Sequence, residues 1–403
     1  MGAGTGISAL RSFWLMGLLC LMSALPPLSI DMGLPAMGAI QTGLGGTARD
    51  QELMLSVFMA GFALTRLAYG ALSDRFGRKP ALYLGLALFT LAGVTCTFAP
   101  SIKVLLVGRF FQGSGAGAGV SLAFAVVRDL FEGPKLGGRL SVLAMVVNTA
   151  PMIAPSMGAL LLGFTGWRGI FGVLAGFGGL VLLLVGVFLP ETRDPRSDGG
   201  FRLGSAVRAL WHDHSALGYV AVYGLSFGSM FAYIASSSLL IIGYFHVSAY
   251  EFALLFALNA AGIVCGAFVS GRISGKFSGR AIAGWGLALS LLGPAWIALL
   301  LVTHRAGLAL TMVGLLVATF GNGLANPAAT KGALSRFPQI SGLIGALLTT
   351  VQMSCAALAS GVAALFLNDW GIAAVPAVML LFAAVAAVIL VFGTDAAESK
   401  KGA

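Results

Sequence analysis

The chain has 403 residues, of which 58% are hydrophobic and 9% are charged. Soluble domains carry about 45–50% apolar and about 25% charged residues, so this few charges could not cover a water-facing surface. The composition excludes an ordinary soluble enzyme, a disordered chain and a coiled coil. The net charge of +10 would suggest nucleic acid in a soluble protein. Here the basic residues lie in short gaps between apolar runs, so we expect a lipid bilayer and no nucleic acid as partner.

Twelve apolar runs follow one another, each near the length of about 20 residues that a helix needs to cross a ~30 Å hydrocarbon core. They cover residues 12–38, 51–71, 80–99, 103–128, 140–164, 169–190, 215–243, 250–271, 281–302, 307–330, 340–366 and 371–393. Strands of a membrane barrel would alternate every second residue, which these runs do not. The sequence therefore predicts an all-α membrane protein with twelve transmembrane helices.

The basic residues predict how these spans are oriented. With the N-terminus in the cytoplasm, most of the 24 lysines and arginines fall into cytoplasmic segments. The outer segments then hold only Arg49, Lys103, Arg168 and Arg305. Cytoplasmic loops of membrane proteins carry such an excess, so both termini are predicted to be cytoplasmic and the number of spans to be even.

The chain also divides into two similar halves. Its longest polar stretch, 191–213, reads as a cytoplasmic linker whose last part forms a short amphipathic helix on the membrane surface. The segment 70–79, GALSDRFGRK, and the segment 271–280, GRISGKFSGR, occupy matching places in the halves. Such parallel repeats are typical of transporters. The predicted units are 1–190, 191–213, 214–393 and 394–403.

Charged groups inside a bilayer are costly and mark functional sites by default. Asp31 is predicted to be the one acid well inside a span, with Asp129 near the inner end of another. Pro35 removes the hydrogen bond to the Asp31 carbonyl and weakens the first span there. Burial disfavours a charged carboxylate, so Asp31 is predicted to exchange a proton and to contact substrate. The alternative places it at the solvated outer end of the span.

Two arginines also fall within spans. Arg109 shares a helix face with Gln112, and we expect the pair to support proton exchange or to bind substrate oxygens. The alternative is that Arg109 anchors a loop or extends its charged end outward. Arg66 lies about 12 Å from the inner end of the second span, where a function and simple snorkelling are equal alternatives.

Two further segments predict moving parts. A gating motif is expected between the second and third spans, at Gly70, Asp74, Arg75, Gly77, Arg78 and Lys79. Asp74 is predicted to pair with a cation or helix end in the other half and lock the cytoplasmic side; the alternative is a topological anchor. In the fifth span, Pro151, Pro155 and Gly158 predict a bent helix that either gates or only packs.

Other polar and aromatic residues in the spans are candidates for lining a substrate cavity, with packing as the alternative for each. They are Asn148, Tyr223, Phe227, Phe231, Asn322, Asn326 and Gln352. No paired carboxylates, nucleophile set, phosphate loop or metal-ligand spacing is present. The sequence therefore predicts neither an enzyme nor a cofactor, and no metal.

Several motifs resemble those of the major facilitator superfamily. Residues 70–79 resemble its signature loop, residues 109–113 its fourth-span motif associated with proton coupling, and residues 154–159 its antiporter motif. The resemblance covers nearly the whole chain. It implies two pseudo-symmetric six-helix bundles that carry a small molecule by alternating access, with the proton gradient as the energy source.

The chain is more narrowly similar to the Bcr/CflA subfamily of drug:proton antiporters. The segments that carry this similarity are 31–35, 128–131, 166–171 and 321–326. It implies a monomer in the bacterial inner membrane that exports chloramphenicol-like or bicyclomycin-like compounds. Subfamily members usually have Gln where Arg66 stands, which implies a different preference for substrate charge. Uniport or symport of a sugar or amino acid is the alternative, and a non-transporting sensor is less favoured.

Overall fold

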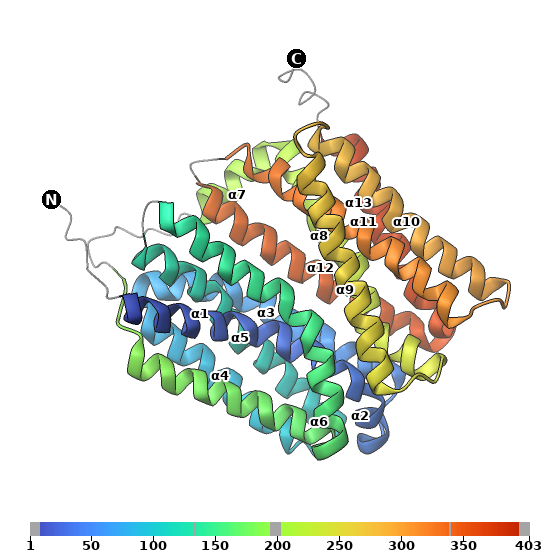
Figure 1. The fold of residues 1–403 in the computed structure, drawn as a ribbon, viewed down its shortest axis with the longest axis horizontal. Coiled ribbons are helices and arrows are strands. Elements are labelled where there is room, and N and C mark those ends of the chain that lie inside the picture. The colour runs from blue at the N-terminus through green and yellow to red at the C-terminus, as the bar shows by residue number, and fades with distance from the viewer. Residues whose placement is uncertain (1–8, 132–133, 194–202, 338–339, 395–403) are drawn as a thin grey trace.

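The computed structural model describes residues 9–131, 134–193, 203–337 and 340–394, and their regular structure is helical throughout (Figure 1). The helical elements are α1 (Ala9–Asp31), the 3-10 turn η1 (Leu34–Ala36), α2 (Met37–Leu44), α3 (Ala48–Phe76), α4 (Arg78–Thr97), α5 (Ile102–Leu130), α6 (Pro134–Phe188), α7 (Leu203–His212), α8 (His214–Ser238), the π-helical turn η2 (Leu239–Tyr244), α9 (Ala249–Ile273), α10 (Gly279–Val302), α11 (Leu308–Leu334), α12 (Ser341–Trp370), η4 (Gly371–Ala373) and α13 (Ala374–Gly393). The all-α prediction is confirmed for the described residues, and the bounds follow the predicted runs closely.

Short polar residues define where several helices begin. The Thr47 hydroxyl accepts from the Asp50 backbone N–H, and the Asp50 carboxylate accepts from the Thr47 backbone N–H in return. Ser248 and Glu251 form the same reciprocal pair at the start of α9. These capping boxes satisfy N–H groups that have no partner inside the helix.

Three long apolar segments are interrupted. The first predicted run breaks after Asp31, where η1 with Pro35 separates α1 from α2. Gly166 has φ 66° within α6, and Gly371 has φ 54° between α12 and α13. Such dihedrals suit glycine, which has no Cβ. The break at Gly166 falls between the runs predicted at 140–164 and 169–190.

Ten segments of the described residues are long and apolar enough to cross a membrane. Two of them, Leu136–Phe188 and Leu343–Gly393, have 53 and 51 residues. A continuous helix of either length would measure about 80 Å, against a hydrocarbon core of ~30 Å. Large apolar side chains also point outward, among them Phe392, which is 84% exposed. An exterior of this kind suits lipid.

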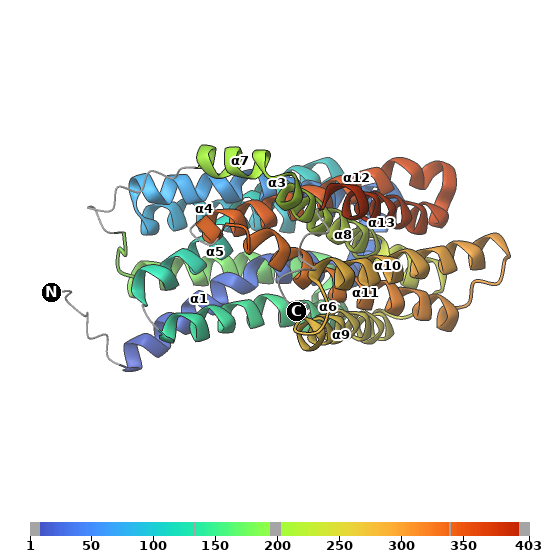
Figure 2. The same cartoon turned by 90° about the horizontal axis from the view of Figure 1, so that it is seen from above.

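The helices pack as two groups. The N-terminal group comprises α1 to α6 and the C-terminal group α8 to α13, and the two meet mainly where α3 packs on α12 and α6 packs on α9. Figure 2 shows these two contacts on opposite faces of the molecule. The predicted amphipathic helix at the end of the linker is α7. Residues 194–202 of the predicted linker and 395–403 of the predicted tail lie outside the described residues.

Candidate functional site

Asp31 is the last residue of α1 and is only 4% exposed. Within the described part of the chain, no hydrogen-bond donor and no cation contacts its carboxylate. The alternative of a solvated end is therefore wrong: Asp31 does end a helix, but it is buried. Burying a carboxyl without a partner is costly, so Asp31 remains a candidate functional residue.

The backbone beside Asp31 is held by an unusually close helix contact. Gly158 of α6 lies against the Met32 carbonyl oxygen, and a Cβ at Gly158 would overlap that oxygen. Both predicted prolines, Pro151 and Pro155, remain inside α6, and the helical dihedrals continue through them. The predicted bend is thus not accompanied by a dihedral break, which occurs at Gly166 instead. Gly158 permits α6 to support the break that carries Asp31.

Arg109 and Gln112 form a buried polar pair in α5. Arg109 is 2% exposed and its Nη1 donates to Gln112 Oε1 at 2.9 Å. Its guanidinium lies 4.4 Å from the centroid of the Phe58 ring and 5.8 Å from that of Phe171. The predicted partnership of Arg109 with Gln112 is present, and ring faces stabilise the cation. Among the described residues, Arg109 and Asp31 form no ion pair.

Gln112 retains unused hydrogen-bonding capacity. Within the described chain its Nε2 atom is buried and has no hydrogen-bond partner. Buried amide donors are nearly always bonded, and an exception asks for an explanation such as a ligand or an ordered water. Gln112 is therefore suited to present a donor to a polar group that enters the N-terminal group of helices.

A second buried acid contradicts the prediction that Asp31 stands alone. Glu52 of α3 is 1% exposed and accepts hydrogen bonds from Ser236 of α8 and from Ser360 of α12. It lies only four residues after the helix starts, where an acid ordinarily complements the helix dipole in water. One feature of the sequence could have indicated Glu52 as an interface residue: Glu52 and Ser56 are four residues apart, so both polar side chains lie on one helix face.

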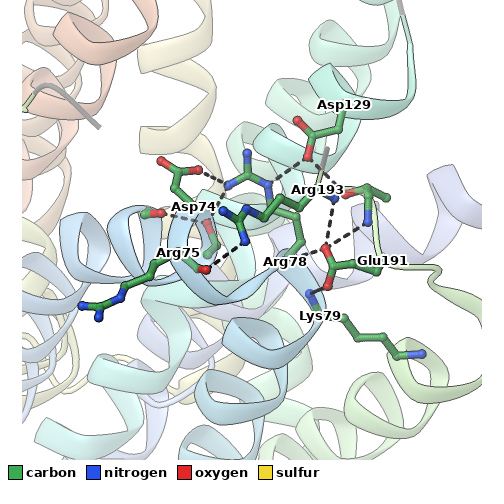
Figure 3. Close-up of polar contacts among 10 residues, drawn as sticks. Asp74, Arg75, Arg78, Lys79, Asp129, Glu191 and Arg193 are labelled. Carbon is green, nitrogen blue, oxygen red and sulfur yellow. Dashed lines mark hydrogen bonds and ion pairs between the residues drawn. The ribbon is translucent and has the colours of Figure 1, made fainter. Parts of the chain in front are cut away.

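The predicted gating motif is centred on Arg78 (Figure 3). Its guanidinium pairs with Asp74 at 2.5 Å and with Asp129 of α5 at 2.9 Å, and it donates to the Ser73 hydroxyl at 2.6 Å. Because Arg78 has five donors in a rigid fork, it can bridge two helices in this way. The site therefore ties α3, α4 and α5 together.

Glu191, which the sequence analysis did not single out, caps the gating motif. Its carboxylate accepts from the backbone N–H groups of Arg78 at 2.8 Å and Lys79 at 3.0 Å, the first residues of α4. Gly77 has φ 105°, and a Cβ there would lie 2.6 Å from a Glu191 oxygen. Glycine is thus required at this position for both its conformation and its small size.

The electrostatics of Glu191 favour its charged form. Partial burial by itself raises the pKa of this carboxyl, but four backbone N–H groups, from Arg193, Arg78, Lys79 and Thr192, lower it overall. A carboxyl whose pKa is lowered in the folded state contributes stability at neutral pH and loses it as the pH falls through that lowered value. The cap of α4 should therefore hold at neutral pH and release only in acid.

Replacing Glu191 by Gln should loosen the first turn of α4. The amide has one acceptor in place of two and lacks the charge that favours a helix N-terminus. We expect hydrogen exchange of the Arg78 and Lys79 amides to accelerate about tenfold at neutral pH, measured by mass spectrometry. Glu251→Gln, which removes the equivalent charge from the α9 capping box, serves as the control. Equal exchange in wild type and Glu191→Gln would contradict this role.

The prediction that Asp74 reaches the other half is wrong for this structure. Among the described residues, every ion pair stays within one group of helices, including that of Arg336 with Asp213. Lys79 donates to the Gly186 carbonyl and Arg193 to the Arg75 carbonyl, again inside the N-terminal group. Gly70 accepts from the Ser73 hydroxyl. The motif here stiffens one group and does not lock two.

The candidate lining residues have different surroundings. Phe231 is 1% exposed and belongs to the core, which agrees with the packing alternative; Phe227 stacks on it with ring centroids 6.0 Å apart. Asn322 is buried and donates to the Ser226 carbonyl at 2.6 Å, and Asn326 donates to Asn322. The asparagines therefore join α11 to α8, which is their packing role.

Five of the candidates retain accessible surface, and Phe227 and Asn326 among them are half-buried. Asn148 is exposed and donates to the Ala144 carbonyl, while Tyr223 and Gln352 are half-buried. Arg66 of α3 is also half-buried and lies within electrostatic reach of Tyr223 of α8, which belongs to the other group of helices. Within the described chain it has no carboxylate partner.

A multi-pass helical bundle with buried acids is typical of a membrane transporter, and the similarity to known proteins agrees. The sequence profile of the Major Facilitator Superfamily matches residues 19–360. The chain belongs to this superfamily.

Its relatives include drug-resistance proteins. The chain is 35% identical to the uncharacterized transporter YdgK of Bacillus subtilis, over 67% of this chain and 68% of the relative. It is 30% identical to the bicyclomycin resistance protein homolog of Haemophilus influenzae, over 84% and 85%. A chloramphenicol resistance protein of Pseudomonas aeruginosa is 29% identical over 80% and 77%.

Solved structures share the fold. A bacterial homolog of the human lysosomal transporter Spinster, in an inward-facing and occupied conformation, has a TM-score of 0.79 over 96% of this chain and 97% of its own. Its sequence identity is 17%. The shared fold therefore extends over nearly the whole length of both chains.

Proposed function

We propose that this protein exports small amphipathic drugs across the bacterial inner membrane in exchange for protons. The drug-resistance relatives support the substrate class, and the proton gradient is the energy source, with no cofactor. The observation that carries the proposal is the buried, unpartnered carboxyl of Asp31 at the break between α1 and α2. A group of this kind can hold either a proton or a polar part of a substrate.

The architecture that we propose has twelve crossings. The 53-residue and 51-residue segments each cross twice, with turns at Gly166 and Gly371. Residues 1–190 and 214–393 then form two six-helix bundles, joined by 191–213 and followed by the tail 394–403. An even number of crossings places both termini on the same side, and the positive-inside rule makes that side the cytoplasm. The protein works as a monomer.

In the proposed cycle, the two bundles rock about a central substrate site. On the outer side, where protons are more concentrated, Asp31 is protonated and drug leaves. On the inner side, Asp31 loses its proton and drug binds. Arg109 and Gln112 supply a fixed cation and a free amide donor near this exchange, while the gating motif keeps the N-terminal bundle rigid as it moves.

Proteoliposomes test this function directly. With an acidic interior and the membrane potential clamped, the protein should accumulate chloramphenicol against its own gradient, and a protonophore should abolish the accumulation. Protein-free liposomes correct for passive entry. Uniport of a metabolite, the competing function, predicts equilibration without accumulation, and symport predicts movement in the opposite direction. Either result would overturn antiport.

Arg66 is expected to set the preference for substrate charge. It is a half-buried cation without a carboxylate partner in the described chain, facing Tyr223 across the two helix groups. An anionic group on the substrate would supply the missing partner. Replacing Arg66 by Gln should weaken binding of 2-naphthoate about tenfold and change binding of the neutral 2-naphthamide less than about twofold.

Calorimetric titration of the purified protein measures both affinities. Arg66→Lys should retain the preference for naphthoate, because it keeps the charge. Arg305→Gln removes an exposed arginine elsewhere and is the matched control. The role of Arg66 fails if naphthoate binds equally well to Arg66→Gln, or if Arg305→Gln weakens it as strongly.

A further inference from the structure

Glu52 lies in a polar seam between the two helix groups. The Ser236 hydroxyl of α8 donates to one of its carboxylate oxygens, and the Ser360 hydroxyl of α12 donates to the other at 3.1 Å. Ser360 is also 2.9 Å from the Glu52 backbone carbonyl. One carboxyl of the N-terminal group therefore contacts two helices of the C-terminal group.

The seam continues one helical turn further along α3. The Ser56 hydroxyl donates to the Ala357 carbonyl at 2.8 Å, and Gly361 leaves room for this contact, since a Cβ there would lie 3.2 Å from the Ser56 oxygen. Glu52 and Ser56 thus form a continuous line of contacts with α12. In the proposed topology this line lies in the outer half of α3, at the outer end of α8 and just outward of the middle of α12. It must separate whenever the transporter opens outward.

No cation neutralises Glu52. Within the described residues no ion pair involves it, and both of its side-chain partners are neutral hydroxyls. Arg49, three residues before Glu52 in α3, is exposed and forms no ion pair with it in the described chain. The titratable side chains on the outer and middle parts of α3 and the elements around it are Asp31, Arg49, Asp50, Arg66, Cys96, Lys103, Arg109, Tyr223, Tyr233, Tyr244, Cys355 and Asp369. Of these, Arg109 is engaged with Gln112 and the ring of Phe58. The closed seam therefore buries the carboxyl without a compensating charge.

The two conformations consequently favour different protonation states of Glu52. Two hydroxyl donors recover only part of the hydration that a carboxylate loses on burial. A neutral carboxyl loses far less, and it can donate to one serine while accepting from the other. The closed seam favours the protonated form, and an open, hydrated seam favours the charged form.

We propose that Glu52 is a second proton-binding group of this transporter, and that its protonation from the outer side permits α3 to close against α8 and α12. This role rests on the proposed alternating access, but it is separate from the exchange at Asp31. In the closed seam Glu52 is only 1% exposed, so its proton enters and leaves when the seam opens to the outer side. The proton gates the return step, in which the outer side closes after drug release.

Distance measurements across the seam test the proposal. Arg49 and Asn368 are exposed at the outer ends of α3 and α12, and each can be replaced by a spin-labelled cysteine in a chain whose four native cysteines are removed. In lipid nanodiscs, the distance distribution gives the populations of the open and closed seam. In the otherwise wild-type protein, the ratio of the open to the closed population should rise at least about tenfold between about pH 5 and about pH 9. Glu52→Gln, which mimics the neutral carboxyl, should remain closed and change less than about twofold.

Two further variants make the outcome decisive. Asp50→Asn removes a neighbouring acid from the α3 capping box and should keep the pH response. Asp31→Asn should also keep it, because the seam responds to Glu52. The proposal is overturned if Glu52→Gln retains the response, or if Asp31→Asn alone abolishes it. Failure of the proposed transport function would appear elsewhere, as unchanged drug exchange by Asp31→Asn in proteoliposomes.

Discussion

Replacing Asp31 by Asn is expected to abolish proton-driven drug accumulation, reducing it to the level of protein-free liposomes. The amide has nearly the same shape but cannot gain or lose a proton, so the drug and the proton no longer compete for one group. Since no partner of the Asp31 carboxylate is lost in the described chain, the melting temperature should change by less than about 4 °C. Accumulation in proteoliposomes and thermal unfolding measure the two effects.

Asp369→Asn provides the control for this variant, because Asp369 is an exposed acid in the last turn of α12. It should accumulate drug like the wild type. A second readout separates coupling from binding: drug affinity should vary with pH in the wild type and become independent of pH in Asp31→Asn. Undiminished accumulation by Asp31→Asn would refute its role as the exchange site.

Replacing Gly158 by Ala should destabilise the protein by about 3 kcal/mol and reduce transport at least about tenfold. A methyl group at this position would overlap the Met32 carbonyl oxygen, which belongs to a backbone that cannot rotate aside. Helices α1 and α6 must then separate, and the break that holds Asp31 moves with them. Thermal unfolding in detergent and drug accumulation in proteoliposomes measure the two losses.

Gly163, in the same helix, offers a matched control. A Cβ at Gly163 would meet no atom within 4 Å, and the residue is exposed. Alanine is the better helix former by about 1 kcal/mol, so Gly163→Ala should keep or slightly raise stability. The two Gly→Ala changes are thus expected to have opposite signs. Equal effects would mean that helix propensity, and not the contact with Met32, determines the result.

In the proposed rocking cycle, the gating motif and the Glu52 seam have different tasks. Around Arg78, ion pairs and the Glu191 cap join elements of one helix group and make it rigid. At Glu52, neutral hydroxyl partners join different groups through contacts that can break and reform. Strong, charge-assisted bonds suit the first task and weaker bonds to serine suit the second.

Features that depend on local sequence were largely predictable. The boundary between runs 140–164 and 169–190 corresponds to the break at Gly166. Pro35 predicted a weakened first span beside Asp31, and the helix ends there. The partnership of Arg109 with Gln112 was also predictable, because residues three apart share a helix face. Each of these depends on spacing along one helix.

Features that depend on contacts between helices were not predictable from the sequence. Glu52 resembled an ordinary acid near a helix start, and only the approach of α8 and α12 makes it a buried interface group. Asp74 was expected to pair across the two halves, but it forms an ion pair with Arg78, four residues further along the chain. For Phe231 the sequence left a cavity wall and packing as alternatives, and only its neighbours in the fold place it in the core.

The sequence by itself determined that this is a helical membrane protein of a transporter family with an acid beside a proline in its first span. Hydropathy, charge bias and proline placement carry that information, because each acts through short stretches of chain and the bilayer imposes the helix. Only the tertiary structure decided which polar groups meet. Glu191 lies 113 residues from Arg78, and Ser360 lies 308 residues from Glu52. The energy of such contacts depends on burial and distance in three dimensions, which residue spacing along the chain does not encode.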